Sequence, residues 1–119
     1  MLNDAGPEQF SGIYIRPGRT DCRKGARGLS EMIQFQFSMS PYQKNVLFLF
    51  CGCSRRMLKA LVWEGDGWLV MTKKLTNGRF QWPRDEEEVR SLTHEQFLRL
   101  MKGFTLDGTI KEGVPKYWG

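Results

Sequence analysis

The chain of 119 residues has the length of one domain, and 40% apolar with 26% charged residues allow a modest core. Residues 16–84 hold 13 Lys/Arg and four Asp/Glu, a net of +9, whereas the remainder holds five and nine, a net of −4. No apolar run reaches the length of a membrane span, and the N-terminus does not resemble a signal peptide. A basic body favours a polyanionic partner, and three cysteines without an export signal predict a reduced, cytoplasmic protein.

The N-terminal third predicts an arm, a strand and a helix. Residues 1–10 are expected to form a flexible polar arm, and residues 13–15 a short strand that ends at Pro17-Gly18. In the helix that follows, the Asp21 carboxylate is placed to accept an amide hydrogen bond from the first turn. Its apolar face is formed by residues at helical spacing, namely Cys22, Ala26, Leu29, Ile33 and Phe37.

The middle of the chain predicts an antiparallel meander. Residues 46–50 read as a buried strand, and Asp66-Gly67 and Asn77-Gly78 separate three further strands at 58–63, 68–75 and 79–82. Both dipeptides suit two-residue hairpin loops, because both central residues need positive φ. The predicted fold class is α+β, with a four- to five-stranded antiparallel meander sheet and two helices packed on one face.

The C-terminal third predicts a linker, a capped helix and a tail. Residues 85–88 form an acidic run, interpreted as a solvated link. Thr93 and Gln96 form a capping box, and Leu92 and Phe97 a hydrophobic staple, for a helix that ends at Gly103. One domain is therefore expected over residues 11–104, followed by an irregular tail at 105–119.

Two-residue loops would place Lys59 opposite Lys74 and Trp63 opposite Val70 on one face of the sheet. Like charges directly opposed cost roughly 0.2–1 kcal/mol, which a bound anion such as a phosphate would relieve. One hypothesis is a nucleic-acid-binding face, with lysines on the backbone and an aromatic on a base or sugar. The other is that Trp63 packs under another segment while the lysines point to water.

A second basic segment lies where the first helix is predicted to begin. Arg23 and Lys24 fall in its first turn, where the helix dipole disfavours cations, and Gly25 and Gly28 lower its helical propensity. A phosphate cradle and close helix–sheet packing are both consistent with this pattern.

Catalytic and metal-binding patterns are not found in the sequence. His94 is the single histidine, and Cys51-Gly52-Cys53 has one intervening residue and no second ligand pair. No phosphate loop or dinucleotide fingerprint occurs. The prediction is a non-enzyme without metal or cofactor.

Five blocks of the sequence resemble, in order and spacing, the small accessory proteins (TnpB, second-open-reading-frame type) of the insertion-sequence sixty-six group. These proteins are unrelated to the RNA-guided nucleases that share the TnpB name. The blocks are Thr-Asp-Cys-Arg-Lys-Gly at 20–25 with Gly28-Leu29, Leu-Phe-Leu-Phe at 47–50, Lys-Ala-Leu-Val-Trp-Glu-Gly-Asp-Gly at 59–67, Lys-Lys-Leu at 73–75 with Gly-Arg-Phe-Gln-Trp-Pro at 78–83, and the helix at 92–100 with Gly103.

The resemblance implies a role in transposition of a bacterial insertion sequence, beside a separate, larger transposase that carries the catalytic acids. The leading prediction is a non-catalytic, nucleoid-associated factor that binds DNA through Arg16, Arg19, Arg23, Lys24, Arg27, Lys59, Lys73, Lys74 and Arg79. The alternative is a protein–protein adaptor that docks on the transposase or on itself, with Trp63, Trp68, Tyr117 and Trp118 as anchors.

Overall fold

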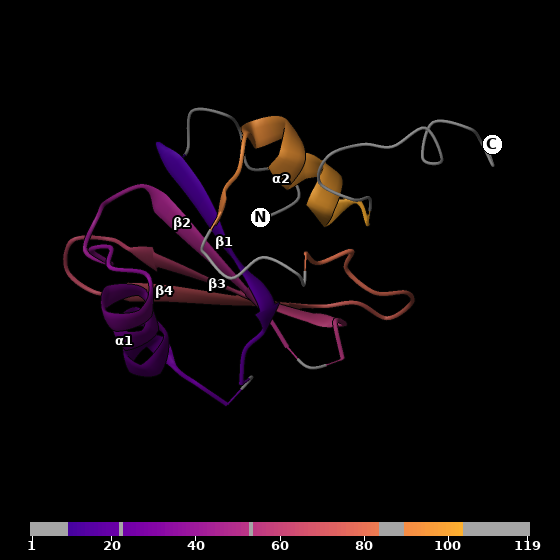
Figure 1. The fold of residues 1–119 in the computed structure, drawn as a ribbon, viewed down its shortest axis with the longest axis horizontal. Coiled ribbons are helices and arrows are strands. Elements are labelled where there is room, and N and C mark those ends of the chain that lie inside the picture. The colour runs from indigo at the N-terminus through magenta and orange to yellow at the C-terminus, as the bar shows by residue number, and fades with distance from the viewer. Residues whose placement is uncertain (1–9, 22, 53, 84–89, 104–119) are drawn as a thin grey trace.

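The computed structural model describes residues 10–21, 23–52, 54–83 and 90–103, which form a five-stranded sheet with one helix on each face (Figure 1). The strand order is β4-β3-β2-β1-β5. In chain order the elements are β1 (Gly12–Arg19), α1 (Ala26–Gln36), β2 (Val46–Cys51), β3 (Met57–Trp63), β4 (Trp68–Lys74), β5 (Arg90–Ser91) and α2 (His94–Met101). The α+β class is confirmed.

The sheet is mixed, so the prediction of a purely antiparallel meander is wrong. β2, β3 and β4 form the predicted antiparallel meander, but β1 pairs with β2 in parallel, and β5 adds antiparallel to β1. Parallel neighbours need a crossover connection, and the segment carrying α1 supplies it between β1 and β2. β1 also continues through Pro17-Gly18, where the sequence predicted a stop, because its pairing with β2 shifts register between Ile15 and Arg19.

Residues 79–82 do not form the predicted fourth meander strand. The amide of Phe80 donates to the carbonyl of Arg55 at 2.8 Å, and the indole Nε1 of Trp82 donates to the carbonyl of Arg16 at 2.7 Å. The segment therefore crosses from the end of β4 towards β1. Phe80 and Trp82 are buried there, on the face that the sequence assigned to them.

The β3–β4 loop has four residues, so the predicted register is wrong by two positions. The amide of Glu64 donates to the carbonyl of Gly67 at 2.9 Å, and Trp63 pairs with Trp68. Gly65 has a φ of 96°, whereas Asp66 and Gly67 have no positive φ. A two-residue loop of type I′ requires positive φ at both of its central residues, and this backbone does not have it.

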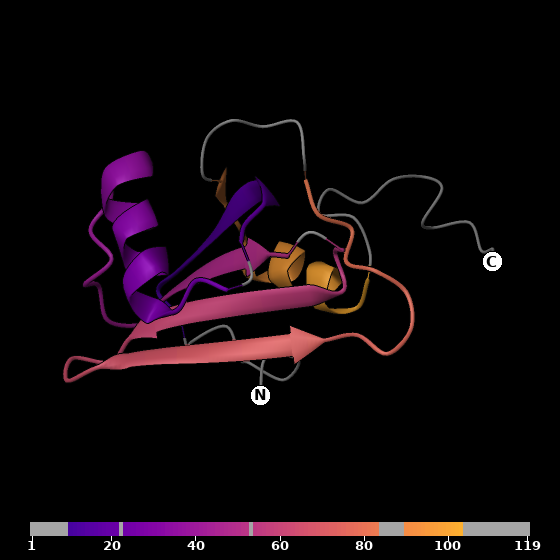
Figure 2. The ribbon, with the colours of Figure 1, turned by 90° about the horizontal axis from the view of Figure 1, so that it is seen from below.

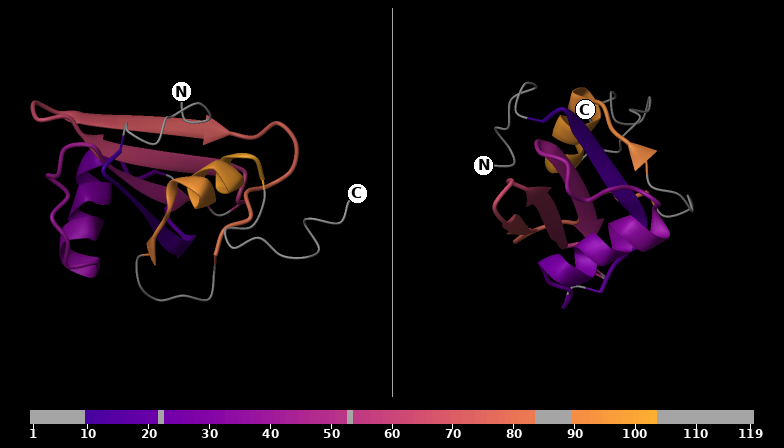
Figure 3. Two further views of the ribbon diagram at one scale, coloured as in Figure 1. Left: turned by 90° about the horizontal axis from the view of Figure 1, so that it is seen from above. Right: turned by 90° about the vertical axis from the view of Figure 1, so that its left-hand side faces the viewer.

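The two helices lie on opposite faces of the sheet, contrary to the prediction of one shared face (Figures 1 and 3). β2 is buried at all six positions and needs cover on both sides. The α2-side core contains Ile13, Ile15, Leu47, Leu49, Cys51, Leu58, Ala60, Val62, Phe80, Trp82, Leu92, Phe97, Leu100 and Met101. The α1-side core contains Leu29, Met32, Ile33, Val46, Phe48, Phe50 and Leu61.

Helix α1 begins later than predicted, because Gly25 and not Asp21 is its N-cap residue. The Oδ1 of Asp21 instead accepts the amide of Arg23 at 2.9 Å, which closes a local turn before the helix. Arg23 and Lys24 thus precede the helix, and of the two glycines only Gly28 lies within it. The predicted conflict of cations with the helix dipole does not arise.

Helix α2 begins as the sequence predicts. The Oγ1 of Thr93 accepts the amide of Gln96 at 3.1 Å, and the Oε1 of Gln96 accepts the amide of Thr93 at 2.8 Å. Leu92 and Phe97 are both buried in the α2-side core, as expected for a staple. Gly103 follows the helix with a φ of 88°, the left-handed backbone predicted there.

We expect Thr93→Ala to lower the free energy of unfolding by about 1 kcal/mol, because the substitution removes the side-chain acceptor of the capping box. Urea denaturation followed by circular dichroism measures the change. Thr76→Ala, at an exposed position in the turn after β4, is the matched control and should change stability little. Equal losses for the two variants would contradict the capping role.

Several predictions lie outside the described residues: the arm at 1–9, Cys22 on the helix face, Cys53, the acidic run at 85–88, and the tail with Tyr117 and Trp118. Within the described part of the chain, no helix has the length and apolar character that crossing a membrane requires.

Candidate nucleic-acid interface

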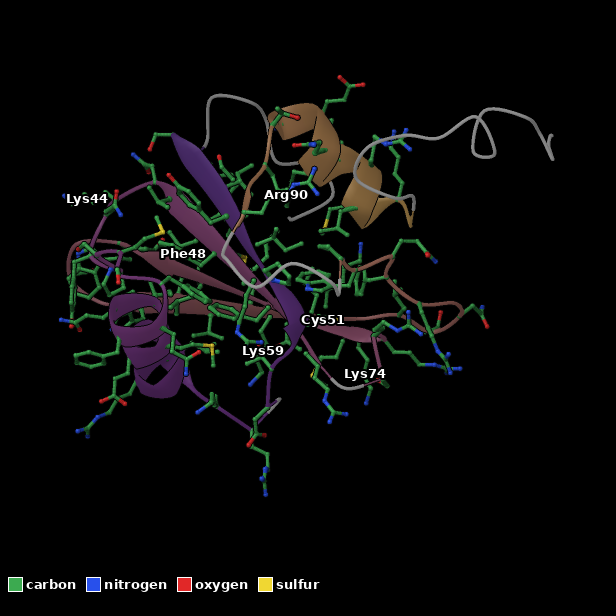
Figure 4. All side chains as sticks on the ribbon, viewed as in Figure 1. Lys44, Phe48, Cys51, Lys59, Lys74 and Arg90 are labelled. Carbon is green, nitrogen blue, oxygen red and sulfur yellow. The ribbon has the colours of Figure 1, made fainter. Side chains whose placement is uncertain are left out.

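Cations gather at one end of the sheet, which we call the basic end. Arg19 ends β1 opposite Cys51, and Lys74 ends β4 opposite Met57, so these strand ends meet where β2 leads into β3. Figure 4 shows Lys59 and Lys74 towards this end and Lys44 at the opposite end. The basic end comprises Arg19, Arg23, Lys24, Arg55, Arg56, Lys59, Lys74 and Arg79.

Five of these eight side chains are exposed, namely Arg19, Arg23, Arg56, Lys74 and Arg79. Residues 16–84 contain four carboxylates, and three lie elsewhere: Glu31 on α1, and Glu64 and Asp66 in the β3–β4 loop. Asp21 is thus the only acid of this part of the chain beside the basic end. An excess of exposed cations over acids creates a positive potential that attracts polyanions.

Arg55 and Arg56 belong to the basic end, although the sequence interpretation treated them only as loop residues. The amide of Arg55 donates to the carbonyl of Gly52 at 3.2 Å, and Arg55 adopts a φ of 61° in the β2–β3 turn. The carbonyl of Arg56 accepts the amide of Leu75 at 2.8 Å, which ties the turn to the end of β4. The sequence contained a signal for this placement, because Arg55 and Arg56 lie in the turn between the predicted strands at 46–50 and 58–63. In an antiparallel meander, that turn lies at the same end of the sheet as Lys74.

Lys59 does not oppose Lys74, so the predicted like-charge conflict is wrong. In the observed register Lys59 lies opposite Thr72, and Lys74 lies opposite Met57. The Nζ of Lys59 donates to the carbonyl of Lys24 at 2.9 Å, which links β3 to the segment before α1. The two lysines therefore do not repel each other across the strand pair, and no bound anion is needed to relieve such repulsion. Both residues still lie at the basic end.

Arg23 pairs with the acid beside the basic end. Its Nε lies 3.1 Å from the Oδ1 of Asp21, and its side chain is 91% exposed. This side-chain hydrogen bond, followed by the one from the Arg23 amide, lowers the pKa of Asp21 from 3.8 to about 2. Arg23 is partly neutralised by this pair and offers less charge to a ligand than Arg19 or Arg56.

We expect Arg23→Gln to raise the pKa of Asp21 towards 3.8, measured by NMR titration of the carboxyl group. A carboxyl group whose pKa is lower in the folded state stabilises the fold above its unfolded pKa. That stability is lost as pH falls through the folded pKa. The free energy of unfolding of the wild-type protein should therefore exceed that of the variant above pH 3.8, and this difference should disappear as pH falls from 3.8 to about 2. An unchanged Asp21 pKa in the variant would contradict this origin of the shift.

Three predicted binding residues, Arg16, Arg27 and Lys73, are not part of the basic end, and their role in binding stays a prediction. Arg16 is half-buried and donates from Nη1 to the carbonyl of Arg19 at 2.6 Å and to the Oγ1 of Thr20 at 3.3 Å. Arg27 is exposed on α1, with its Nε 3.9 Å from Glu31. Lys73 points to the other face of β4 from Lys74, and burial lowers its pKa.

Aromatic side chains gather at the opposite end of the sheet. The rings of Trp63 and Trp68 lie 4.8 Å apart, and Tyr42 lies 5.1 Å from Trp63 and 5.2 Å from Trp68. Tyr42 is 56% exposed and was not among the predicted anchors. A groove of about 310 Å³ adjoins this cluster, lined by Phe10, Lys44, Asn45, Val62, Trp63, Glu64, Leu69 and Met71. Lys59, Lys74, Trp63 and Trp68 therefore share one face of the sheet, as the sequence predicted, but the two lysines and the two tryptophans lie at opposite ends of it.

No group of three or more His, Cys, Asp or Glu side chains that could hold a metal ion occurs among the residues that the structure describes.

The described residues form a small α+β domain with a basic surface at one end of a mixed sheet. Residues 11–110 match the family described as IS66 Orf2-like protein, and the chain belongs to this family. The resemblance found in the sequence is thereby confirmed, and membership associates the chain with transposition in an accessory role.

Two relatives come from Sinorhizobium fredii (strain NBRC 101917 / NGR234), and both are called uncharacterized. The chain is 34% identical to protein y4hO over 91 residues, which cover 76% of this chain and 78% of the relative. It is 27% identical to protein y4jC over 110 residues, which cover 92% of each chain. No solved structure matches.

Proposed function

We propose that this chain is a non-catalytic accessory factor in the transposition of a bacterial insertion sequence, and that it binds DNA through the basic end. The observation that carries the proposal is the convergence of eight cations on one end of the sheet, five of them exposed, where Asp21 supplies the one carboxylate among the residues that the structure describes. Exposed Lys and Arg bind DNA chiefly by replacing the counterions of its phosphates.

Among the described residues, the aromatic cluster lies at the other end of the sheet from these cations. Proteins that hold single strands without sequence preference add aromatic stacking to a basic groove. A basic surface without such rings supports contact with the DNA backbone rather than with unstacked bases. We therefore propose that the basic end binds duplex DNA with little sequence preference.

Fluorescence polarisation with labelled duplexes and single strands at several salt concentrations tests this proposal. Five exposed cations, each on one phosphate, give a slope of log affinity against log salt of up to about −4.5 on duplex DNA. Affinity for the duplex should at least equal affinity for the single strand, and should change little between sequences. Absence of duplex binding at low salt, or binding that does not respond to salt, would contradict the proposal.

The alternative function, a protein–protein adaptor for the transposase, rests on the aromatic end. Tyr42, Trp63 and Trp68 form a partly exposed cluster beside the groove, and aromatic residues dominate interface hot spots. This surface does not overlap the basic end. Loss of co-purification with the transposase of the same element on Tyr42→Ala, with DNA affinity retained, would favour the adaptor function for this surface.

A further inference from the structure

Strand β4 forms an edge of the sheet, and its charged residues lie at one end of the strand only. Its inner side pairs with β3 at all seven positions without a register shift, and no strand of the described residues pairs with its outer side (Figure 2). Natural edge strands are commonly protected by charged side chains, especially lysine, by a proline or by a bulge. Here both lysines lie at the C-terminal end, and residues 68–72 contain no charge, proline or glycine.

Both faces of this edge also present apolar surface. Val70, in the middle of β4, is 36% exposed and is one of three exposed large hydrophobic residues among those described. On the other face, Leu69 and Met71 are half-buried and line the groove of about 310 Å³. An added strand would cover Val70 on one face and border Leu69 and Met71 on the other.

We propose that β4 pairs with β4 of a second copy of this chain, antiparallel, around a two-fold axis at Met71. Met71 is the middle residue of the seven-residue strand, so this register pairs every position of β4. Lys74 then faces Trp68 of the second copy, Lys73 faces Leu69, and Val70 faces Thr72. The same patch meets itself, as a two-fold interface requires.

The charges of β4 favour a second copy in this orientation. An antiparallel pair brings the basic end of each strand to the uncharged end of the other, and Lys74 can lie over the indole of Trp68 in a cation–π contact. A parallel pair in register would instead place Lys73 on Lys73 and Lys74 on Lys74, and directly opposed like charges are destabilising. Antiparallel pairing therefore keeps the lysines of the two copies apart and brings each Lys74 to a tryptophan of the other copy.

Light scattering coupled to size-exclusion chromatography tests the proposal over micromolar to hundreds-of-micromolar protein. The wild-type chain should show twice the 13.8 kDa of a single chain at high concentration. Val70→Lys places a charge in the middle of the edge, and we expect it to reduce the mass to that of one chain. Phe35→Lys, at a residue of α1 that is 73% exposed, is the matched control and should leave the dimer intact.

Circular dichroism establishes that both variants are folded before their masses are compared. Hydrogen exchange adds a second readout, because amides on the outer side of β4 should gain protection as wild-type concentration rises and should not do so in Val70→Lys. A wild-type chain that stays monomeric overturns the proposal, even if it binds the transposase through β4. A dimer that survives Val70→Lys also overturns it. The outcome does not depend on DNA binding, because no DNA is present in either measurement.

Discussion

Neutralising Arg56 and Lys74 together is expected to weaken duplex DNA binding by on the order of 10- to 100-fold at about 0.1 M salt. The Arg56 turn is tied to the end of β4 by the hydrogen bond from Leu75, and both side chains are exposed at the basic end. Each phosphate contact that is lost should also lower the magnitude of the salt slope by about one. Arg56→Gln with Lys74→Gln should therefore reduce that magnitude by about two, measured by fluorescence polarisation.

Lys44→Gln with Lys102→Gln provides a control that removes the same charge. Both residues are exposed and neither belongs to the basic end: Lys44 lies before β2 at the opposite end of the sheet, and Lys102 follows α2. This double variant should lose far less affinity for duplex DNA, because the loss depends on contacts with phosphates and not on net charge alone. Equal losses for the two double variants would mean that the basic end is not the binding surface.

The local signals in the sequence predicted most of the elements, apart from β5 and the strand expected at 79–82, but pairing between elements was harder to predict. The capping box at Thr93 and Gln96 was confirmed because it involves only neighbours in the chain. The β3–β4 register was missed because Asp66-Gly67 was read as the whole loop. The Glu64–Gly67 hydrogen bond and the contact between Trp63 and Trp68 instead select a four-residue loop. A shift by two positions preserves the faces, so the predicted apolar face remained correct although the pairs were wrong.

The placement of the helices depended on a signal that was present in the sequence but not used. Residues 46–50 are apolar at every position, and a strand that is buried on both faces needs cover on both. Leu47 and Leu49 pack on the α2 side, and Phe48 and Phe50 on the α1 side. The basic end followed from the same topology, because strand order brings Arg19, Arg56 and Lys74 together although they are far apart in the chain. Of the nine predicted binding residues, Arg19, Arg23, Lys24, Lys59, Lys74 and Arg79 lie there.

Phe48→Ala is expected to lower the free energy of unfolding by about 3–5 kcal/mol. Phe48 is 1% exposed in the central strand β2, stacks on Tyr14 at 5.7 Å, and belongs to the α1-side core. Its removal leaves a cavity between the sheet and α1 that neighbours on a fully buried strand cannot easily fill. Because domains of this size are stable by only about 5–15 kcal/mol, the variant should approach the limit of folding. Urea denaturation followed by tryptophan fluorescence measures the loss.

Phe35→Ala applies the same substitution to a residue of α1 that is 73% exposed, and it should change stability by less than about 0.5 kcal/mol. The comparison discriminates between the two arrangements of the helices. If both helices covered the α2 side, Phe48 would point to solvent and the two variants would behave alike. A large difference between them follows only from a sheet that is covered on both faces. With both faces covered by helices, the contacts that we propose use one end of the sheet for DNA and the β4 edge for a second copy.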